Sequence, residues 1–410
     1  TVCPLCPRAC PVKARCVGDQ PVSLSGIPGH PVSHGSLCPV GIAAHQLTYH
    51  PSRVTEPVTI SFAGGHGALT PVSLDSVVDH VKEIIRASRG PDSRFAILDQ
   101  QPGRIVSSVY REFLGKYADG LYLSAYKGSS PCVDALYSMT TAEPNLVFEC
   151  DFERADTVVS FGVPVTDFWK TASVFSHRMK GAPNGRLHLI QIEPSGSRTS
   201  ALADEWISLR PGTEILLALA VGHVLLRDGL CDVDDIRAIT SDFRDGNGRS
   251  YADLVQQCSP DRISGICQVP LRTIEHLAAT LVRRKPAIVI GWHNPLLGFG
   301  SDETEIAILG LNILLGNIGR EGGIIPVKNS VAPGGPLTAA TLDEVPDHSL
   351  RLLILDPAES GIVIPWEMIN RKLEPEKGVV VSLSPYMAGY ASHATYCVPS
   401  PAYLESLQDM

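Results

Sequence analysis

Short apolar runs alternate with amphipathic segments along most of this chain. Residues 95–98 form an apolar run that ends at Asp99, and the flanking segments 73–87 and 105–117 carry apolar residues at the spacing of one helix face. Further apolar runs predict strands at 155–162, 186–194, 287–291, 352–357 and 379–383, and apolar helices at 214–227 and 303–315. This repeated order of strand, polar loop and helix predicts an α/β protein with doubly wound parallel sheets.

The beginning of the chain has a different pattern. Its first fifty or so residues are rich in Pro, Gly and Cys, with short strand-like pieces such as 21–24 and little helical periodicity. They predict a small β-rich domain at 1–55. Behind it we expect one α/β domain formed by 56–185 with 325–410, and a second formed by 186–324.

Four cysteines of the β-rich domain have the spacing of a metal–sulfur site. Cys3, Cys6 and Cys10 form a C-x2-C-x3-C motif, and Cys38 follows at a distance. Three thiolates from one short loop can hold three corners of a cubane [4Fe–4S] cluster, and a distant fourth thiolate closes it. Pro39 restricts the backbone directly after that last ligand. The spacing therefore predicts an iron–sulfur protein that carries electrons.

Structural zinc and disulfide bonds are the alternatives for this quartet. A zinc ribbon usually has two matched C-x2-C pairs, whereas here the third cysteine comes one residue late and Cys38 has no close partner. Disulfide scaffolds are typical of small secreted domains rather than of a 410-residue chain with 11 cysteines. We expect Cys16 to be an apolar strand residue outside the cluster.

Composition and charge argue against several classes of protein. The formal net charge is −9 and no basic cluster is present, which disfavours nucleic acid as the main partner. The apolar stretches 215–226 and 306–315 are shorter than the roughly eighteen residues that span a bilayer, so any membrane association is expected through a partner. No G-x-G-x-x-G, Walker A, G-x-S-x-G or H-E-x-x-H motif supports the usual dinucleotide, phosphate-loop or hydrolase interpretations.

Several segments, in order along the chain, resemble the molybdopterin oxidoreductases of the dimethyl sulfoxide reductase type. They are the cysteine quartet, then 31–38 with 50–54, 155–162, 192–199, 203–214 and 311–323. The segment 203–214, in which Ala-Asp-Glu-Trp leads into Arg-Pro-Gly-Thr-Glu, is the most specific of them after the cysteines. The resemblance implies doubly wound α/β domains behind an iron–sulfur domain.

The resemblance also implies a site for a molybdopterin guanine dinucleotide. In that family the loop matching 193–199 and the turn matching 212–214 line the pocket of one such cofactor. The candidate cofactor-binding residues are Glu193, Ser197, Thr199, Gly212, Thr213 and Glu214. A carboxylate such as Glu214 can accept two N–H bonds from a guanine edge, and hydroxyls and loop amides can meet the pyrophosphate. The alternative is that Glu214 only places a charge at the N-terminus of the following helix.

Departures from the family pattern bear on catalysis. Members that pass electrons between cluster and pterin often have a lysine two residues after the fourth cysteine, where this chain has Val40, and a tryptophan usual near the start of the next domain is replaced by Leu74. Relatives place a metal ligand in the loop matching 129–132, so Cys132 is the catalytic candidate, as a ligand of molybdenum or tungsten. The alternative is a buried structural cysteine.

Two histidines and the end of the sequence complete this comparison. His177 and His293 are candidate proton donors at such a centre, and each is otherwise a loop residue satisfied by its neighbours. Larger relatives continue beyond the segment 401–405 into a domain that encloses a second pterin. Either this chain is incomplete, or a full cofactor cage is missing.

The chain looks similar to subunits of respiratory quinone-reducing complexes that keep the fold and a cluster but lack a working molybdenum centre, notably in 99–114 and 161–169. We therefore expect an electron-relaying subunit of the menaquinone reductase or alternative complex III kind. Its expected partners are iron–sulfur or cytochrome subunits and a membrane anchor, at the extracytoplasmic, periplasmic face of the membrane. The alternatives are a catalytic subunit with a bis-pterin molybdenum or tungsten centre for formate or sulfur oxyanions, and a scaffold whose cluster only holds the first domain together.

Overall fold

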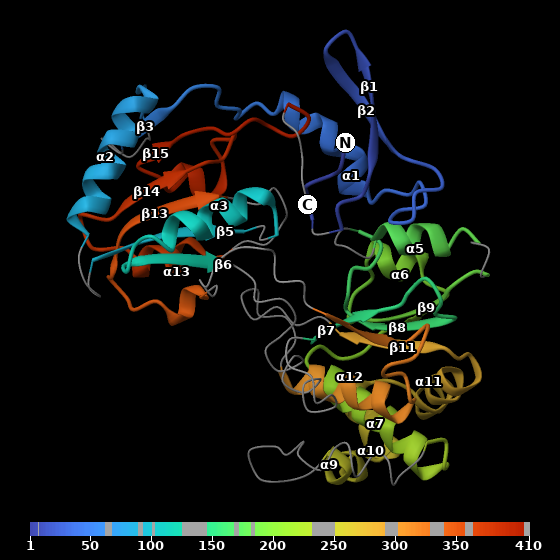
Figure 1. Ribbon diagram of the computed structural model, residues 1–410. Coiled ribbons are helices and arrows are strands. Elements are labelled where there is room, and N and C mark those ends of the chain that lie inside the picture. Colours follow the sequence, from blue (N-terminus) through green and yellow to red (C-terminus); the bar gives the residue numbers. More distant parts are fainter. Residues whose placement is uncertain are drawn as a thin grey trace. The chain divides into compact units, whose positions relative to one another are not determined.

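Two compact units make up the protein (Figure 1). The computed structural model describes residues 1–6, 8–61, 68–88, 93–100, 103–124, 146–167, 172–181, 185–231, 251–291, 302–328, 340–356 and 364–405. The first unit is Thr1–Lys127 with Ser330–Met410, and the second is Gly128–Asn329. Both contain parallel sheets with helical crossovers, so the predicted α/β fold class is confirmed.

The first unit holds a seven-stranded sheet in the order β4-β3-β15-β14-β13-β5-β6. Its strands are β3 (Val58–Ser61), β4 (Ala68–Pro71), β5 (Arg94–Asp99), β6 (Gly120–Ser124), β13 (Leu350–Asp356), β14 (Val379–Ser382) and β15 (Tyr396–Cys397). The strands from β15 to β6 run parallel, whereas β3 and β4 join antiparallel at one edge. Its helices are α2 (Leu74–Ala87), α3 (Ile105–Leu114) and α13 (Trp366–Lys372).

The crossovers of this sheet define a switch point between β5 and β13. From β5 the chain passes through α3 to β6 on one side, and from β13 through α13 to β14 on the other. Apolar residues of these strands pack with Ile84 of α2 and Leu114 of α3 in one buried core. In doubly wound sheets, ligands bind at the carboxyl ends of the strands that flank such a switch point.

The cluster region of the first unit is a hairpin with two short helical segments. Strands β1 (Val12–Val17) and β2 (Gln20–Gly26) pair antiparallel, and α1 (Pro39–Ala43) leads into the 3-10 turn η1 (Ala44–Tyr49). Its small core includes Leu5, Val12 and Leu24, and Tyr403 from far along the chain packs into it. The β-hairpin agrees with the predicted β-rich character of this region. Near its end, the Thr48 hydroxyl donates to the Tyr403 carbonyl at 3.4 Å, which ties the region to the segment around Tyr403.

The second unit is built on a parallel sheet in the order β10-β9-β8-β11. The strands are β8 (Thr157–Phe161), β9 (His188–Ile192), β10 (Glu205–Ile207) and β11 (Ala287–Gly291), and β7 (Leu146–Cys150) pairs antiparallel with β12 (Ile324–Lys328) outside this sheet. The helices are α5 (Ala172–Arg178), α6 (Arg198–Leu202), α7 (Glu214–Arg227), α9 (Tyr251–Gln257), α10 (Pro260–Cys267), α11 (Leu271–Arg283) and α12 (Asp302–Leu314). Figure 1 shows α5 and α6 on one face of the sheet and α7, α11 and α12 on the other.

Two contacts position α12 in this second unit. The side chain of Asn312 donates to the Val289 carbonyl and accepts from the Val289 N–H, at 2.7 and 3.0 Å, which locks the helix to β11. At Gly310, a Cβ atom would stand 2.1 Å from the Tyr251 ring, so only glycine lets α9 approach so closely.

The boundary between the two α/β parts differs from the prediction. The sequence pattern puts residues up to 185 with the first α/β domain, but β8 pairs along its whole length with β9, and the second unit begins at Gly128. An apolar run predicts that a strand forms, whereas its neighbours in the sheet depend on contacts distant in sequence. The later boundary, at Asn329, lies close to the expected one at 324/325.

Candidate cluster and nucleotide sites

The first three cysteines lie on a loop that is closed by backbone hydrogen bonds. The Cys3 N–H donates to the Cys10 carbonyl at 2.8 Å, and the Ala9 N–H donates to the Cys6 carbonyl at 3.3 Å. Ala9 has a positive φ of 51°, which turns the chain sharply before Cys10. Cys3 and Cys10 are buried and Cys6 is partly buried. The loop therefore gathers three thiols in a short space.

Cys38 joins this group from the start of α1. It is the N-cap residue, and its Sγ accepts a hydrogen bond from the Gly41 N–H at 3.2 Å. A Cβ atom placed on Gly41 would lie 3.6 Å from the sulfur of Cys38 and 4.0 Å from that of Cys3, so both thiols flank this glycine. Cys3 also lies near enough to Cys6 and Cys10 for their charges to interact, so the four cysteines occupy one region of the structure.

The chemistry of the four thiols fits an iron–sulfur cluster. Burial, with a contribution from the neighbouring cysteines, raises the pKa of Cys3 to about 12 and the pKa of Cys6 to about 11. Neighbouring thiolates in a buried site repel one another, so they need a positive charge close by. Iron would supply that charge, and each thiol would lose its proton when it binds the metal. Cys3, Cys6, Cys10 and Cys38 would hold the cluster.

The described cysteines outside the quartet do not extend this site. Cys16 lies in strand β1, as expected. Its side chain is exposed, however, and is not buried as we expected for an apolar strand residue. No disulfide bond joins two of the ten cysteines in the described part of the chain. Among the described residues, no three His, Cys, Asp or Glu side chains, those of the quartet included, are grouped closely enough to hold a single metal ion.

Glu193 ends β9 at the carboxyl edge of the second sheet, and its side chain holds the loop that follows. One carboxylate oxygen accepts from the Ser197 N–H at 3.1 Å and the other from the Gln191 side-chain amide at 2.9 Å. The residue is only 8% exposed. Glu193 is thus placed to shape the loop rather than to reach far into solvent.

The other candidates for nucleotide binding differ in how accessible they are. Thr199 is fully buried in the first turn of α6, and its hydroxyl lies 3.0 Å from that of Thr166, so it joins α6 to the loop after β8. Thr213 is buried and donates to the Arg210 carbonyl at 2.5 Å. Gly212 is exposed with a φ of 76°, and Glu214 is partly exposed in the first turn of α7. Of the six candidates, Ser197, Gly212 and Glu214 are at least partly exposed. Ser197 is also the N-cap of α6, so its hydroxyl already accepts from the Ser200 N–H at 3.2 Å and its own N–H donates to Glu193.

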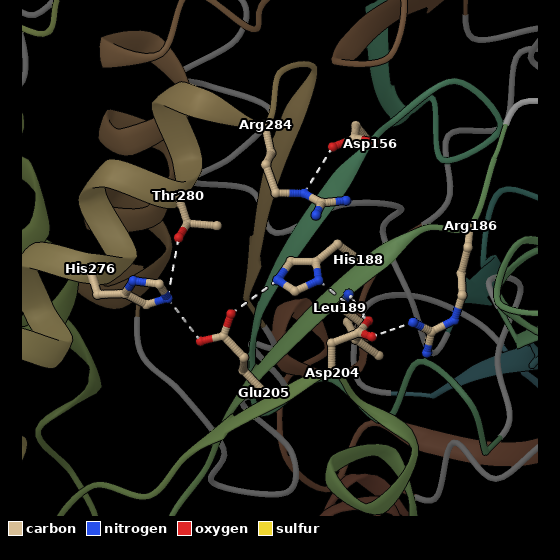
Figure 2. Close-up of polar contacts among 9 residues, drawn as sticks. All are labelled: Asp156, Arg186, His188, Leu189, Asp204, Glu205, His276, Thr280 and Arg284. Atoms are coloured by element: carbon tan, nitrogen blue, oxygen red, sulfur yellow. Dashed lines mark hydrogen bonds and ion pairs between the residues drawn. The ribbon is translucent and has the colours of Figure 1, made fainter.

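A polar network lies near the amino ends of the strands in the second unit. Figure 2 shows Glu205 between the rings of His188 and His276, with separations of 3.1 and 3.3 Å between the facing atoms. Asp204 pairs with Arg186 and accepts from the Leu189 N–H at 2.9 Å. The network ties β9 and β10 to α11. It lies away from the carboxyl edge where ligands of such sheets bind.

A second buried polar cluster occupies the switch point of the first unit. Arg104 lies 3.0 Å from an oxygen of Asp99, at the end of β5, and 2.6 Å from an oxygen of Asp356, at the end of β13. Tyr110 donates to Asp356 at 2.9 Å and Tyr122 donates to Asp99 at 2.8 Å. Burial and the proximity of Asp99 raise the pKa of Asp356, against the opposing effects of Arg104 and Tyr110. Asp99 was visible in the sequence as a strand end, but its partnership with Asp356 was not.

The expected metal ligand and proton donors are placed only in part. Cys132 and His293 lie outside the described residues. His177 lies in α5, on the face of the sheet that also carries α6. Neither the molybdenum ligand nor the proton donors are therefore tested by the structure.

Fold and site together define an α/β protein with a cysteine quartet near its beginning and exposed loops at the carboxyl edge of its second sheet. Residues 1–50 match the Fe4S4 domain of molybdopterin oxidoreductases, and residues 66–407 match the molybdopterin oxidoreductase domain itself. The chain belongs to the molybdopterin oxidoreductase family. These matches support the [4Fe–4S] cluster and a molybdopterin cofactor, as the sequence resemblance implies.

The relatives have names that describe them as molybdopterin-binding-like or molybdopterin-containing subunits. The chain is 27% identical over 354 residues to the menaquinone reductase molybdopterin-binding-like subunit of Nitratidesulfovibrio vulgaris, covering 84% of this chain and 48% of that protein. It is 25% identical to the thiosulfate reductase molybdopterin-containing subunit of Salmonella typhimurium, with 80% of this chain and 42% of that protein covered. The chain therefore spans less than half the length of these two relatives.

A solved structure supports the fold. Acetylene hydratase from Pelobacter acetylenicus matches with a TM-score of 0.71 and 17% identity, over 99% of this chain and 63% of that one. In the described part of this chain, none of the helices has the length and apolar character of a bilayer-spanning segment.

Proposed function

We propose that this protein is an electron-relaying, [4Fe–4S]-containing subunit of a membrane-associated respiratory complex that reduces a menaquinone-type quinone. The proposal is supported by the cysteine quartet, of which Cys3 and Cys38 flank Gly41, and by the similarity to a subunit whose name describes it as molybdopterin-binding-like. The cluster supplies one-electron transfer when bound. The chain's own contribution includes the Gly41 N–H, which donates to the Cys38 sulfur and so favours the reduced form of a cluster held there.

The observation that carries the relay role is the surface of α1. Val40 follows Cys38 by two residues and is 43% exposed, at the position where relatives that connect cluster and pterin often have lysine. Ile42 is 52% exposed, and Ala43 between them on the helix surface is exposed too. No polar side chain on this face can hydrogen-bond to a pterin, whereas an apolar face suits contact with a partner protein. We propose that electrons enter or leave through a partner.

The partners would be iron–sulfur or cytochrome subunits together with a membrane anchor, and the chain would lie peripherally at the periplasmic face. Support comes from the relatives' names, which include the menaquinone reductase subunit and a formate dehydrogenase alpha subunit associated by name with cytochrome c-553. We also propose that the loop 193–199 and the turn 212–214 hold the guanine end of one pterin dinucleotide, with Glu214 as acceptor. The partial exposure of Glu214 and of Ser197 supports this.

The test is anaerobic redox titration of the isolated complex, with the cluster followed by electron paramagnetic resonance. We expect the cluster to equilibrate reversibly with a water-soluble menaquinone analogue. A Cys132→Ser variant should behave as the parent does. Turnover of formate or thiosulfate by the complex, abolished by Cys132→Ser while the cluster signal persists, would replace the relay role with the catalytic one.

A further inference from the structure

The segment 203–206 contains one large apolar residue, Trp206, that packing within the fold buries only in part. Its Asp204 and Glu205 belong to the network in Figure 2, which ties β9 and β10 to α11. Ala203 donates its N–H to the Thr199 carbonyl at 2.9 Å and so ends α6. Trp206 is different, because 49% of this large apolar residue is exposed.

The position of Trp206 directs its ring towards the candidate nucleotide loop. Side chains alternate along a strand, so Trp206 lies on the face of β10 opposite to Glu205 and Ile207, which is the face that α6 covers. Its indole N–H donates to the Glu193 carbonyl at 3.1 Å. This bond satisfies the one polar atom of the side chain and fixes the ring, so that what remains exposed is apolar aromatic surface.

The ring also stands directly beside the loop. A Cβ atom on Gly196 would lie 3.7 Å from the outer edge of the Trp206 ring, so loop backbone and ring are in contact distance. Residues 194–196 are exposed, and because Pro194 has no N–H, the backbone N–H groups open to a ligand there are those of Ser195 and Gly196. Arg198 follows in the first turn of α6 with 56% of its side chain exposed, and within the described part of the chain it makes a long, 3.7 Å contact with Asp167. A flat aromatic surface, open amides and a cation therefore meet at one loop.

We propose that Trp206 is the surface on which the purine base of a nucleotide stacks when its phosphates bind at the loop 194–198. The inference rests on the nucleotide site of the proposed function and adds a positioning residue to it. Every base has a π-face that an exposed indole can cover, and the larger purines gain more from stacking than pyrimidines. Phosphate oxygens would accept from the Ser195 and Gly196 N–H groups and from Arg198, because Pro194 has no N–H and the Ser197 N–H already donates to Glu193.

The experiment titrates guanosine monophosphate into the full chain and follows tryptophan fluorescence and heat of binding. The chain has four tryptophans, so the Trp206 signal is the difference between the parent and Trp206→Phe. We expect the nucleotide to quench that signal, Trp206→Ala to weaken binding about tenfold, and Trp206→Phe to weaken it by about threefold or less. Cytidine monophosphate should bind the parent more weakly. Leu202→Ala, which removes another exposed apolar side chain at the end of α6, should bind like the parent.

Each contrary outcome has a distinct meaning. If Trp206→Ala binds guanosine monophosphate as the parent does, or if the Trp206 signal does not change, the stacking role is refuted. If Glu214→Gln weakens binding at the same time, the nucleotide site itself stands. If the parent binds no nucleotide while its iron content is full, both the site and the stacking role fail, and electron relay is left to its own redox test. Equal melting temperatures of Trp206→Phe and parent exclude misfolding as the cause of a loss.

Discussion

Replacing Arg104 with methionine tests whether the buried ion pairs of Arg104 with Asp99 and Asp356 stabilise the switch point of the first unit. Arg104 bridges Asp99 and Asp356 with contacts of 3.0 and 2.6 Å. Its side chain is 17% exposed, and those of Asp99 and Asp356 are 0% and 12% exposed. Methionine fills a similar volume but removes the guanidinium that bridges the two buried carboxylates.

The expected loss is about 3 kcal/mol of unfolding free energy. Breaking a buried ion pair by removing one partner costs about 3–5 kcal/mol. The lower end applies because hydroxyl donors remain, from Tyr122 to Asp99 and from Tyr110 to Asp356. The matched variant is Asp356→Asn, which leaves Arg104 paired with Asp99. Since burial already raises the pKa of Asp356 and so opposes its charge, this variant should cost less than about 1 kcal/mol.

The pH dependence has a definite sign. The folded-state pKa of Asp356 is raised above its unfolded value, so the stability this group contributes is present at low pH and is lost as pH rises through the folded pKa. Removing the guanidinium raises that pKa further, which moves the loss to a higher pH range. The deficit of Arg104→Met relative to the parent should therefore shrink by about 1 kcal/mol between pH 7.5 and pH 5.

Hydrogen exchange with mass spectrometry measures these effects locally. The opening free energies of amides in β5 and β13 should fall in Arg104→Met, while those of β8 and β9 in the second unit should not change. Two results would refute the reasoning: a loss as large in Asp356→Asn as in Arg104→Met, or a deficit that grows on acidification.

Two further predictions concern the cluster and the core of the second unit. Cys38→Ser should lower the iron content per chain and unfold the cluster region, because one corner of the cluster loses its thiolate. The control is Cys16→Ser, a change at an exposed cysteine, which should leave the iron content unchanged. Elemental analysis measures both, and equal iron in the two variants would contradict the assignment of the quartet. Gly310→Ala should cost about 3 kcal/mol, because its Cβ would lie 2.1 Å from the Tyr251 ring, and calorimetry should show a melting temperature lower by roughly 6–10 °C. Gly265→Ala, in α10 with no atom within 4 Å of the new Cβ, should instead be neutral or slightly stabilising, and a similar loss in both would show that the close contact is not the cause.

Local patterns predicted the elements that depend on local chemistry. The apolar segment 214–227 is observed as α7, with the same bounds, because it is buried along most of its length and charged at its first residue. The amphipathic α11 was not predicted, although Ile274, Leu277, Ala278 and Leu281 have helical spacing and are all buried. The periodicity of these apolar residues was therefore enough to predict α11 from the sequence.

Other features depend on partners far along the chain. The motif predicted that Thr199 binds phosphate, yet its hydroxyl is hydrogen-bonded to that of Thr166, which is 33 residues away in the sequence. Arg104 and Asp356 are 252 residues apart and meet only because β5 and β13 are neighbours in the sheet. The cysteine quartet was predictable because ligand type and spacing carry the signal, whatever the surrounding fold.

The central claim, that the chain relays electrons through its cluster, is tested most directly by elemental analysis of the isolated complex. Iron, molybdenum and tungsten are measured per copy of this chain, with extraction for pterin fluorescence alongside. We predict iron that depends on Cys38, and neither molybdenum nor tungsten bound to this chain. About one molybdenum or tungsten per chain, lost in a Cys132→Ser variant that keeps its iron, would contradict the relay role and identify a catalytic subunit.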